Sequence, residues 1–236
     1  MKRHFGKWLT AAALAVGCTV MTANAFADTD GHWAESAINK WSGEYGIIQG
    51  YDDGTFRPDK SITRGAFAGI LDRFLHFQNT SPADTFSDTA GTYWEDAILK
   101  LHASGIYLGN QGAALPSSTI TRQQAVAMIG RAFRIAPETA APDYTDTDQI
   151  AEYALAYVGE FEVRGYLTDS AAGTFRPTDP ITRAEFVVML NRGTSHLFTE
   201  GRIHTRLLQQ ALSQSQAEKT LQCEGNEREL MLIYSC

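Results

Sequence analysis

Three copies of one short motif constrain this sequence more than any other feature. Each copy runs from a glycine into an apolar segment: GTFRPDKSITRGA at 54–66, GAALPSSTITRQQ at 112–124 and GTFRPTDPITRAE at 173–185. In every copy a proline precedes a threonine by five residues, and Ile-Thr-Arg follows. Constant spacing within otherwise different sequence is typical of one supersecondary unit repeated along a chain. We therefore expect three similar units.

Each unit is expected to contain two helices joined by a loop. An aromatic-x-Asp motif precedes the first helix, which ends at a glycine that can take the left-handed conformation just after a helix: Gly46, Gly105 or Gly165. The second helix starts after the repeated threonine, and apolar residues then recur with the 3.6-residue period of a helix. In the first copy these are Phe67, Ile70, Leu71 and Phe74. The predicted fold class is all-α, with three helix-loop-helix repeats.

The threonine of each copy is expected to cap the second helix. Threonine accepts a hydrogen bond from a free amide of the first turn, and a Glu or Gln three residues later completes a capping box. Glu185 can do this for Thr182 and Gln124 for Thr121, whereas Thr63 is followed by Gly65 and Ala66. The helix after Thr63 should therefore have the weakest start.

An arginine follows each of these threonines: Arg64, Arg122 and Arg183. A cation in the first turn opposes the helix dipole, so a reason other than helix propensity is needed. Two explanations stay open: the planar guanidinium binds a carboxylate or phosphate ligand, or it pairs with an aspartate of a neighbouring repeat. A second set lies near the helix C-termini, where the dipole favours a cation, and is expected to be structural: Arg73, Arg131 and Arg192.

Composition limits the classes of function. The chain has 236 residues, a formal net charge of −7 and no run of basic residues. It is long enough for a sizeable core, and its charge argues against binding of nucleic acid or other polyanions in general. An acidic ligand would have to be held by local arginines.

The N-terminus predicts export. Lys2, Arg3 and Lys7 precede an apolar stretch that ends near Met21, and Ala-Asn-Ala follows at 23–25. This is the pattern of a cleaved signal peptide, because the apolar stretch is too short to span a membrane. We therefore expect no membrane span in the mature chain, with lipidation at Cys18 as the alternative. Two cysteines remain after cleavage and could pair: Cys223 and Cys236.

Catalytic and metal-binding patterns are not recognisable. Asp52, Asp53 and Gly54 resemble part of a calcium loop but lack the alternating ligands and the closing glutamate, so a β-turn is expected. Glu152 and Glu160 are ordinary surface acids, and no nucleophile order, zinc motif or phosphate loop is present. We expect no catalytic residues, no cofactor and no metal.

The three ordered copies behind a signal peptide resemble the S-layer homology (SLH) family. The resemblance covers about residues 26–193. After the signal peptide expected at 1–25, it implies repeats at 26–77, 85–135 and 143–193, which leave a tail at 194–236. It further implies a pseudo-threefold helical body with grooves between repeats, which holds an exported protein on the bacterial cell wall. The implied partner is secondary cell-wall polysaccharide, often bearing pyruvate ketals, or peptidoglycan.

Candidate glycan-binding residues follow from the resemblance, motif by motif. They are Arg64, Arg122 and Arg183, then Asp28, Asp88 and Asp146 of the aromatic-x-Asp motif, and Trp33 and Trp94. Core packing is the alternative for both tryptophans, and a helix-start or turn role for the aspartates. All three grooves are expected to form with unequal affinity. Because the second copy has Gln123-Gln124 in place of Ala-Glu and lacks Phe-Arg before Pro116, we rank the grooves of Arg183 and Arg64 above that of Arg122.

Other functions remain as alternatives. The chain could be the truncated anchor of a larger S-layer protein or envelope enzyme, or a component that self-associates into a surface layer. The sequence leaves open the oligomeric state, the glycan, and the role of the tail.

Overall fold

Each unit contributes two main helices in this computed structural model, which describes residues 26–136, 141–168 and 173–199. Unit 1 (26–77) holds α1 (Glu35–Ile38), continued by the π-helical turn η1 (Asn39–Glu44), and α2 (Arg64–Leu75). Unit 2 (85–135) holds α3 (Glu95–Ala103) and α4 (Arg122–Ala132), preceded by the turn η2 (Ala83–Thr85). Unit 3 (143–193) holds η3 (Thr147–Gln149), α5 (Glu152–Val163) and α6 (Arg183–Thr199), which extends past the unit. The all-α prediction is confirmed for this part of the chain, whereas the predicted signal peptide and the tail beyond 199 lie outside it.

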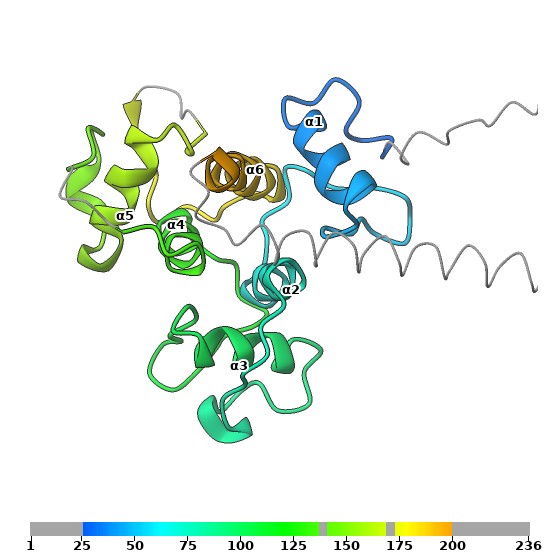
Figure 1. The fold of residues 1–236 in the computed structure, drawn as a ribbon, viewed down its shortest axis with the longest axis vertical. Helices are drawn as coiled ribbons and strands as arrows, with labels where there is room; N and C mark the ends of the chain where they lie inside the picture. The colour runs from blue at the N-terminus through cyan, green and yellow to red at the C-terminus, as the bar shows by residue number, and fades with distance from the viewer. Residues whose placement is uncertain (1–25, 137–140, 169–172, 200–236) are drawn as a thin grey trace, which may run out of the picture.

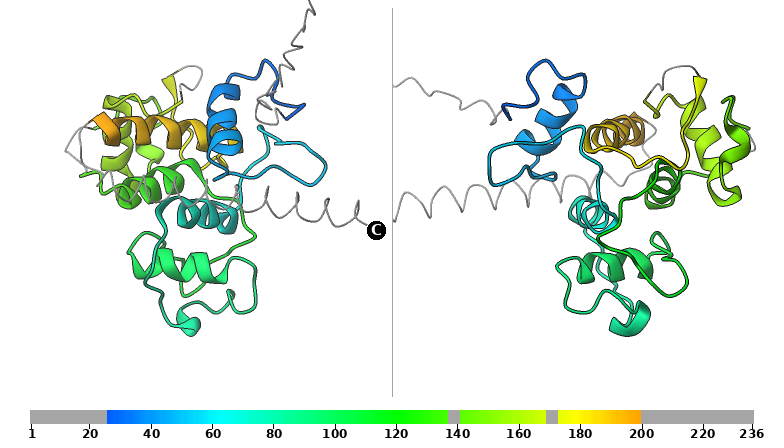
Figure 2. Two further views of the ribbon diagram at one scale, coloured as in Figure 1. Left: turned by 45° about the vertical axis from the view of Figure 1, so that its right-hand side comes forward. Right: turned by 180° about the vertical axis from the view of Figure 1, so that it is seen from behind.

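The second helices of the units form the centre of the molecule. In Figure 1, α2, α4 and α6 lie close together, and the first helix of each unit lies in one of three surrounding lobes. Figure 2 shows the same arrangement from behind. Each central helix packs against the first helix of the next unit: α2 on α3, α4 on α5, and α6 on α1. The last unit thereby returns to the first, which closes a pseudo-threefold ring.

Backbone hydrogen bonds between three equivalent isoleucines close this ring. The amide of Ile62 donates to the carbonyl of Ile181 (3.1 Å), Ile181 donates to Ile120 (3.0 Å), and Ile120 donates to Ile62 (3.2 Å). All three side chains are buried, with at most 1% of their surface exposed. These residues directly precede the capping threonines, so the ring fixes the starts of α2, α4 and α6 relative to one another.

The first helices end as the glycine pattern predicts. Gly46, Gly105 and Gly165 have φ values of +65°, +71° and +67°, in the left-handed region, directly after the last helical turn. Unit 1 departs from the expectation of a regular first helix, because α1 is only four residues long before it widens into η1. Trp41 of η1 is buried there, with its ring 5.2 Å from that of Phe74.

The core is continuous across the units. Phe67 of α2 packs on Phe186 of α6 at a ring separation of 4.7 Å, and Phe74 of α2 packs on Phe133 at 5.9 Å. Each fully buried side chain of this size contributes about 1.5–3 kcal/mol relative to exposure. None of the helices in residues 26–199, outside the two internal gaps, combines the length and hydropathy that a membrane span needs.

Candidate functional site

The three arginines that follow the capping threonines all reach into the next unit. Nε of Arg64 donates to the carbonyl of Ala114 in unit 2, Nε of Arg122 to Phe175 in unit 3, and Nε of Arg183 to Phe56 in unit 1, each at 2.8 Å. The three residues are only 7%, 1% and 8% exposed. The arginines therefore form the same contact between units three times. The three sites differ in the partners of the other guanidinium nitrogens.

The loop that each arginine meets has an unusual backbone. The residue just before the repeated proline has a φ near +57° although it is not glycine: Arg57 (+56°), Leu115 (+58°) and Arg176 (+58°). A left-handed non-glycine residue is strained and persists where its surroundings hold it. Each of these residues donates its backbone amide to an aspartate carboxylate, which is exposed at Asp28, half-buried at Asp88 and buried at Asp146.

The aspartates of the aromatic-x-Asp motif hold these loops. Each carboxylate accepts two backbone amides, one from the strained residue and one from the residue before it, at 2.6–2.8 Å; the three are Asp28, Asp88 and Asp146. Burial opposes ionisation of Asp28, but the amides of Phe56 and Arg57 outweigh it and hold its pKa below the usual value. The structure thus gives the aspartates a turn-holding role, and direct glycan contact stays a prediction for them.

Arg64 lines a cavity of about 510 Å³ whose wall comes mostly from unit 2, with Tyr153 of unit 3 on its edge. Besides Ala114, its Nε lies 3.1 Å from the hydroxyl of Tyr107, and its guanidinium lies 4.7 Å from the centre of that ring. Its Nη1 donates to Oε1 of Gln124 at 3.2 Å. Arg64 therefore has neutral partners only, and its positive charge is not matched by any of these contacts.

The rest of the cavity lining is also free of acids. A second guanidinium, Arg131, and the ring of Tyr153 lie on the wall with Arg64. Apolar and neutral polar side chains complete it: Ile106, Leu108, Leu115, Met128, Asn110, Ser118, Thr119, Thr121 and Gln124. Two cations without a carboxylate, beside an aromatic ring and exposed leucines, suit a small ligand that carries an acid group and an apolar face.

The ring of Tyr51 lies beside three cationic side chains, one of which is Arg183. The guanidinium of Arg57 lies 3.9 Å from the Tyr51 ring centre, Nζ of Lys60 at 5.0 Å, and Arg183 at 5.1 Å. Only Arg57 pairs here with an acid, Asp53, at 2.6 Å. Hydrogen bonds from Thr55 and Arg57 lower the pKa of Asp53 to about 2. Burial lowers the pKa of Arg183, against the opposing field of Tyr51 and Asp28.

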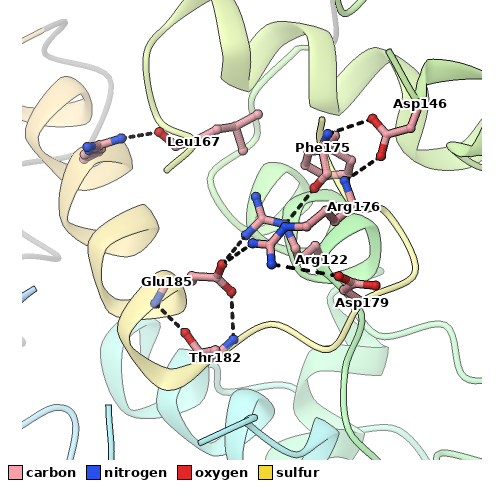
Figure 3. Close-up of polar contacts among 9 residues, drawn as sticks. Arg122, Asp146, Leu167, Phe175, Arg176, Asp179, Thr182 and Glu185 are labelled. Atoms are coloured by element: carbon pink, nitrogen blue, oxygen red, sulfur yellow. Dashed lines mark hydrogen bonds and ion pairs between the residues drawn. The ribbon is translucent and has the colours of Figure 1, made fainter. Parts of the chain in front are cut away.

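Arg122 differs, because an acid of the next unit neutralises it. Its Nη1 lies 2.9 Å from Oε1 of Glu185, and the same oxygen pairs with Nη2 of Arg176 at 2.7 Å. Figure 3 shows both guanidinium groups converging on this one carboxylate. Burial lowers the pKa of Arg122, and the charge of Glu185 offsets part of that effect. The alternative of an internal ion pair is therefore found for Arg122, with a glutamate in place of an aspartate.

The structure changes the physical basis for ranking the three grooves. The divergent loop of unit 2 lies against Arg64 and not against Arg122, since each arginine crosses to the next unit. Unit 2 compensates for its missing phenylalanine with Tyr107, which is fully buried under Arg64. Glu185 supplies a different physical reason to place Arg122 last.

The aromatic residues of the first helices take different positions. Trp33 is 57% exposed. Trp94 is half-buried on α2, where a Cβ on Gly65 or Gly69 would come within 2.4 Å of its ring. The glycine at 65, which weakens the cap of α2, thus makes room for this tryptophan. Tyr153, which stands where units 1 and 2 have tryptophan, is a wall of the Arg64 cavity.

The second set of arginines closes the loops of their own units. Nη1 of Arg73, Arg131 and Arg192 donates to the carbonyls of Ile47, Ile106 and Leu167, each of which lies one or two residues after a helix-ending glycine. These arginines therefore have a structural role, because each one binds a backbone carbonyl in the loop after the first helix of its unit. Sequence reasoning missed that Arg131 also lines the cavity, although its spacing of seven residues from Gln124 and three from Met128 puts all three on one face of a helix.

The capping groups form as their residue types suggest. The amide of Glu185 donates to Oγ1 of Thr182 at 3.1 Å, and the amide of Thr182 donates back to the Glu185 carboxylate at 2.9 Å. At Thr121 the backbone amide donates to Oε1 of Gln124 at 3.2 Å, which is the return half of such a pair. At Thr63 only the forward bond, from the amide of Ala66 at 3.2 Å, is present.

Within residues 26–199, apart from the gaps, no three His, Cys, Asp or Glu side chains are placed to hold a metal ion. Asp53, part of the loop that resembles a calcium site, instead accepts from the amide and hydroxyl of Thr55 at 3.0 and 2.6 Å. This is a turn held by its own side chains.

In a comparison with known protein families, two of the three units match a family profile. The sequence profile of the S-layer homology domain matches residues 25–68 and 143–187, in units 1 and 3. Unit 2 occupies the equivalent place in the ring of backbone hydrogen bonds.

The chain is similar to parts of much longer curated proteins. A cellulosome-anchoring protein of Acetivibrio thermocellus is 36% identical over 124 residues, 50% of this chain and 28% of that protein. The surface-layer 125 kDa protein of Lysinibacillus sphaericus is 27% identical over 151 residues, 62% of this chain and 13% of the relative. An amylopullulanase of Thermoanaerobacterium thermosulfurigenes is 26% identical over 171 residues, which are 70% of this chain and 9% of that protein. The match thus spans less than a third of each relative.

Proposed function

Since this chain carries S-layer homology domains, a family of non-catalytic anchoring modules, we propose that it attaches an exported protein non-covalently to the bacterial cell wall. Two of the relatives above are named as an anchoring protein and a surface-layer protein, which supports an extracellular location on the wall. The proposed partner is a wall polysaccharide that carries acidic groups, such as pyruvate ketals.

The acid-free cavity at Arg64 is the observation that carries this proposal. A pyruvate ketal places one carboxylate and one methyl group on a sugar ring. Arg64 and Arg131 provide cationic donors for the carboxylate, while Leu108 and Leu115 provide an apolar surface for the methyl group. Tyr153 is an aromatic surface of the kind that covers a sugar face.

The burial of Arg64 strengthens this interaction. The side chain is only 7% exposed and is held by Tyr107 and Ala114, so little conformational entropy is lost when a ligand binds. A charge-assisted hydrogen bond to such a group contributes about 1.5–3 kcal/mol. A module that holds several acidic groups of one polymer gains further affinity from multivalency.

Sedimentation with purified cell walls tests this function. The protein is mixed with walls that carry pyruvylated polysaccharide and with the same walls after mild acid has removed the pyruvate. We expect retention on the first and at least a tenfold loss on the second, about 1.4 kcal/mol. Equal retention on both would contradict recognition of the ketal, and no retention on either would contradict wall attachment.

A further inference from the structure

The three arginine sites differ at one equivalent position, the third residue of the central helix in the next unit. Gln124 occupies this position beside Arg64, and Glu185 occupies it beside Arg122. Ala66 is the equivalent residue in α2, which follows Arg183 around the ring. The side chain at this position is thus a carboxylate beside Arg122, an amide beside Arg64 and a methyl group beside Arg183.

This series determines how much of each arginine's charge is already matched. Arg122 has a carboxylate partner at 2.9 Å, and both are buried, with 1% and 12% of their side chains exposed. Arg64 has an amide oxygen at 3.2 Å, which accepts a hydrogen bond without cancelling the charge. Arg183 donates to the backbone carbonyls of Phe56 and Gln49, both at 2.8 Å.

From this difference we infer that Glu185 acts as an internal substitute for the acidic ligand, so that the protein binds acidic groups at Arg64 and Arg183 and not at Arg122. The inference rests on the proposed function, which it makes more specific. The residue three positions into the central helix is then the specificity determinant of each site.

The charges around Arg122 and Arg64 support this assignment, and Arg183 donates to backbone carbonyls although the charge of Asp28 also acts on it. Beside Arg122, the Glu185 carboxylate also receives Arg176, which in turn lies 3.8 Å from Asp179. An acidic guest there would have to displace a buried carboxylate from two guanidinium groups, and like charges in close contact cost several kcal/mol. None of the residues that line the Arg64 cavity is acidic, so an acidic ligand there would not have to displace a carboxylate.

Helix capping and ligand exclusion use the same side chain. One oxygen of Glu185 accepts from the amide of Thr182 at 2.9 Å, while the other meets Arg122 and Arg176. Gln124 caps Thr121 in the same way through its amide oxygen. An exchange between Gln and Glu therefore changes the charge at the arginine while it keeps the cap and the shape.

The decisive experiment exchanges this residue in the full chain. The probes are the methyl glucoside and the methyl mannoside that each carry a 4,6-pyruvate ketal, and titration calorimetry gives the number of sites. We expect two sites in the parent protein. Q124E should remove one of them and weaken that binding by about tenfold or more. E185Q should add a third site.

Position 66 gives a matched pair that keeps the hydrogen bond from its backbone amide to Thr63. Glu or Gln at 66 can each complete the missing half of the cap at Thr63, so A66E and A66Q should both unfold at higher temperature than the parent protein. Only A66E places a carboxylate beside Arg183. We expect A66E to lose one binding site and A66Q to keep it, so that stability and binding change in opposite directions in A66E.

The Nε–Hε signals of the arginines in NMR spectra locate the binding, after assignment with single Arg→Lys variants. On titration of the parent protein, Arg64 and Arg183 should shift and Arg122 should not. Three equivalent shifts, or binding by Q124E and A66E equal to that of the parent protein, would overturn the inference while leaving wall attachment intact. If neither the probes nor pyruvylated walls bind the parent protein, the proposed function and this inference both fail.

Discussion

Arg64 and Arg122 begin equivalent helices, yet one faces a cavity and the other is enclosed in an ion pair. Both donate through Nε to a carbonyl of the next unit at 2.8 Å. The difference comes from their neighbours, because Gln124 and Leu115 near Arg64 are replaced by Glu185 and Arg176 near Arg122. A repeated motif can thus hold units together at one site and leave a charge for a ligand at another.

The strongest test of this comparison replaces the neighbour by leucine at both sites. Glu185→Leu leaves Arg122 without its carboxylate, and we expect a loss of about 3–5 kcal/mol in the free energy of unfolding. Gln124→Leu removes an amide acceptor and half of a cap, with an expected loss of about 1–2 kcal/mol, because Arg64 keeps Tyr107, Ala114 and the cavity. Urea unfolding of both variants measures the difference. Equal losses would mean that the buried charge of Arg122 is not the distinguishing feature.

Removing the arginine itself should separate binding from stability. Arg64→Ala is expected to weaken wall binding by about 1.5–3 kcal/mol while the helical circular dichroism spectrum is retained. Arg122→Ala should leave the affinity of the folded fraction unchanged. Wall sedimentation at several protein concentrations gives both affinities. If Arg64→Ala unfolds the protein, the arginine holds units 1 and 2 together more than it serves a ligand.

The next test concerns Trp94, which precedes α3 and packs against α2, the helix that begins at Arg64. Gly69→Ala gains about 1 kcal/mol of helix propensity but brings a Cβ within 2.4 Å of the Trp94 ring, so we expect a net loss of about 1 kcal/mol. In a Trp94→Phe background the smaller ring relieves this clash, and the same substitution should become stabilising. Thermal unfolding of the four proteins in this cycle measures the coupling. An unchanged sign in both backgrounds would show that Trp94 does not depend on the glycines of α2.

The smallest expected effect compares the caps of two helices. Thr63→Ala removes a single side-chain bond at the start of α2 and should cost about 0.5–1 kcal/mol. Thr182→Ala breaks one half of a reciprocal pair with Glu185 and should cost about 1–2 kcal/mol. The corresponding serine variants retain the hydroxyl and serve as controls. A larger loss at Thr63 would contradict the weaker cap assigned to α2.

Much of the fold was predictable because it depends on local rules. Thr63, Thr121 and Thr182 begin helices since a short side-chain oxygen satisfies a free amide, and glycines end the first helices since they tolerate a positive φ. The repeat and its apolar periodicity then give three helix-loop-helix units. The short α1 and the π-helical turn after it were not predicted, because no residue pattern in this stretch marks the change of helix type.

The candidate site was predictable only in part. The sequence identified the arginines as unusual, since a cation in the first turn of a helix needs another reason to be there. It did not show that each arginine crosses into the next unit, so the divergent loop of unit 2 was assigned to the wrong arginine. Arg131 was interpreted as structural alone, although it also faces the cavity.

By itself, the sequence of this protein determined the unit, the number of copies and the starts and ends of most helices, because capping, turn formation and amphipathic periodicity act over a few residues. Only the tertiary structure decided which of the three equivalent arginines is paired with a carboxylate. That outcome depends on distances between residues about 60 positions apart, such as Arg64 and Gln124 or Arg122 and Glu185. Electrostatic pairing depends on spatial distance and burial, and the closed ring of three units sets both.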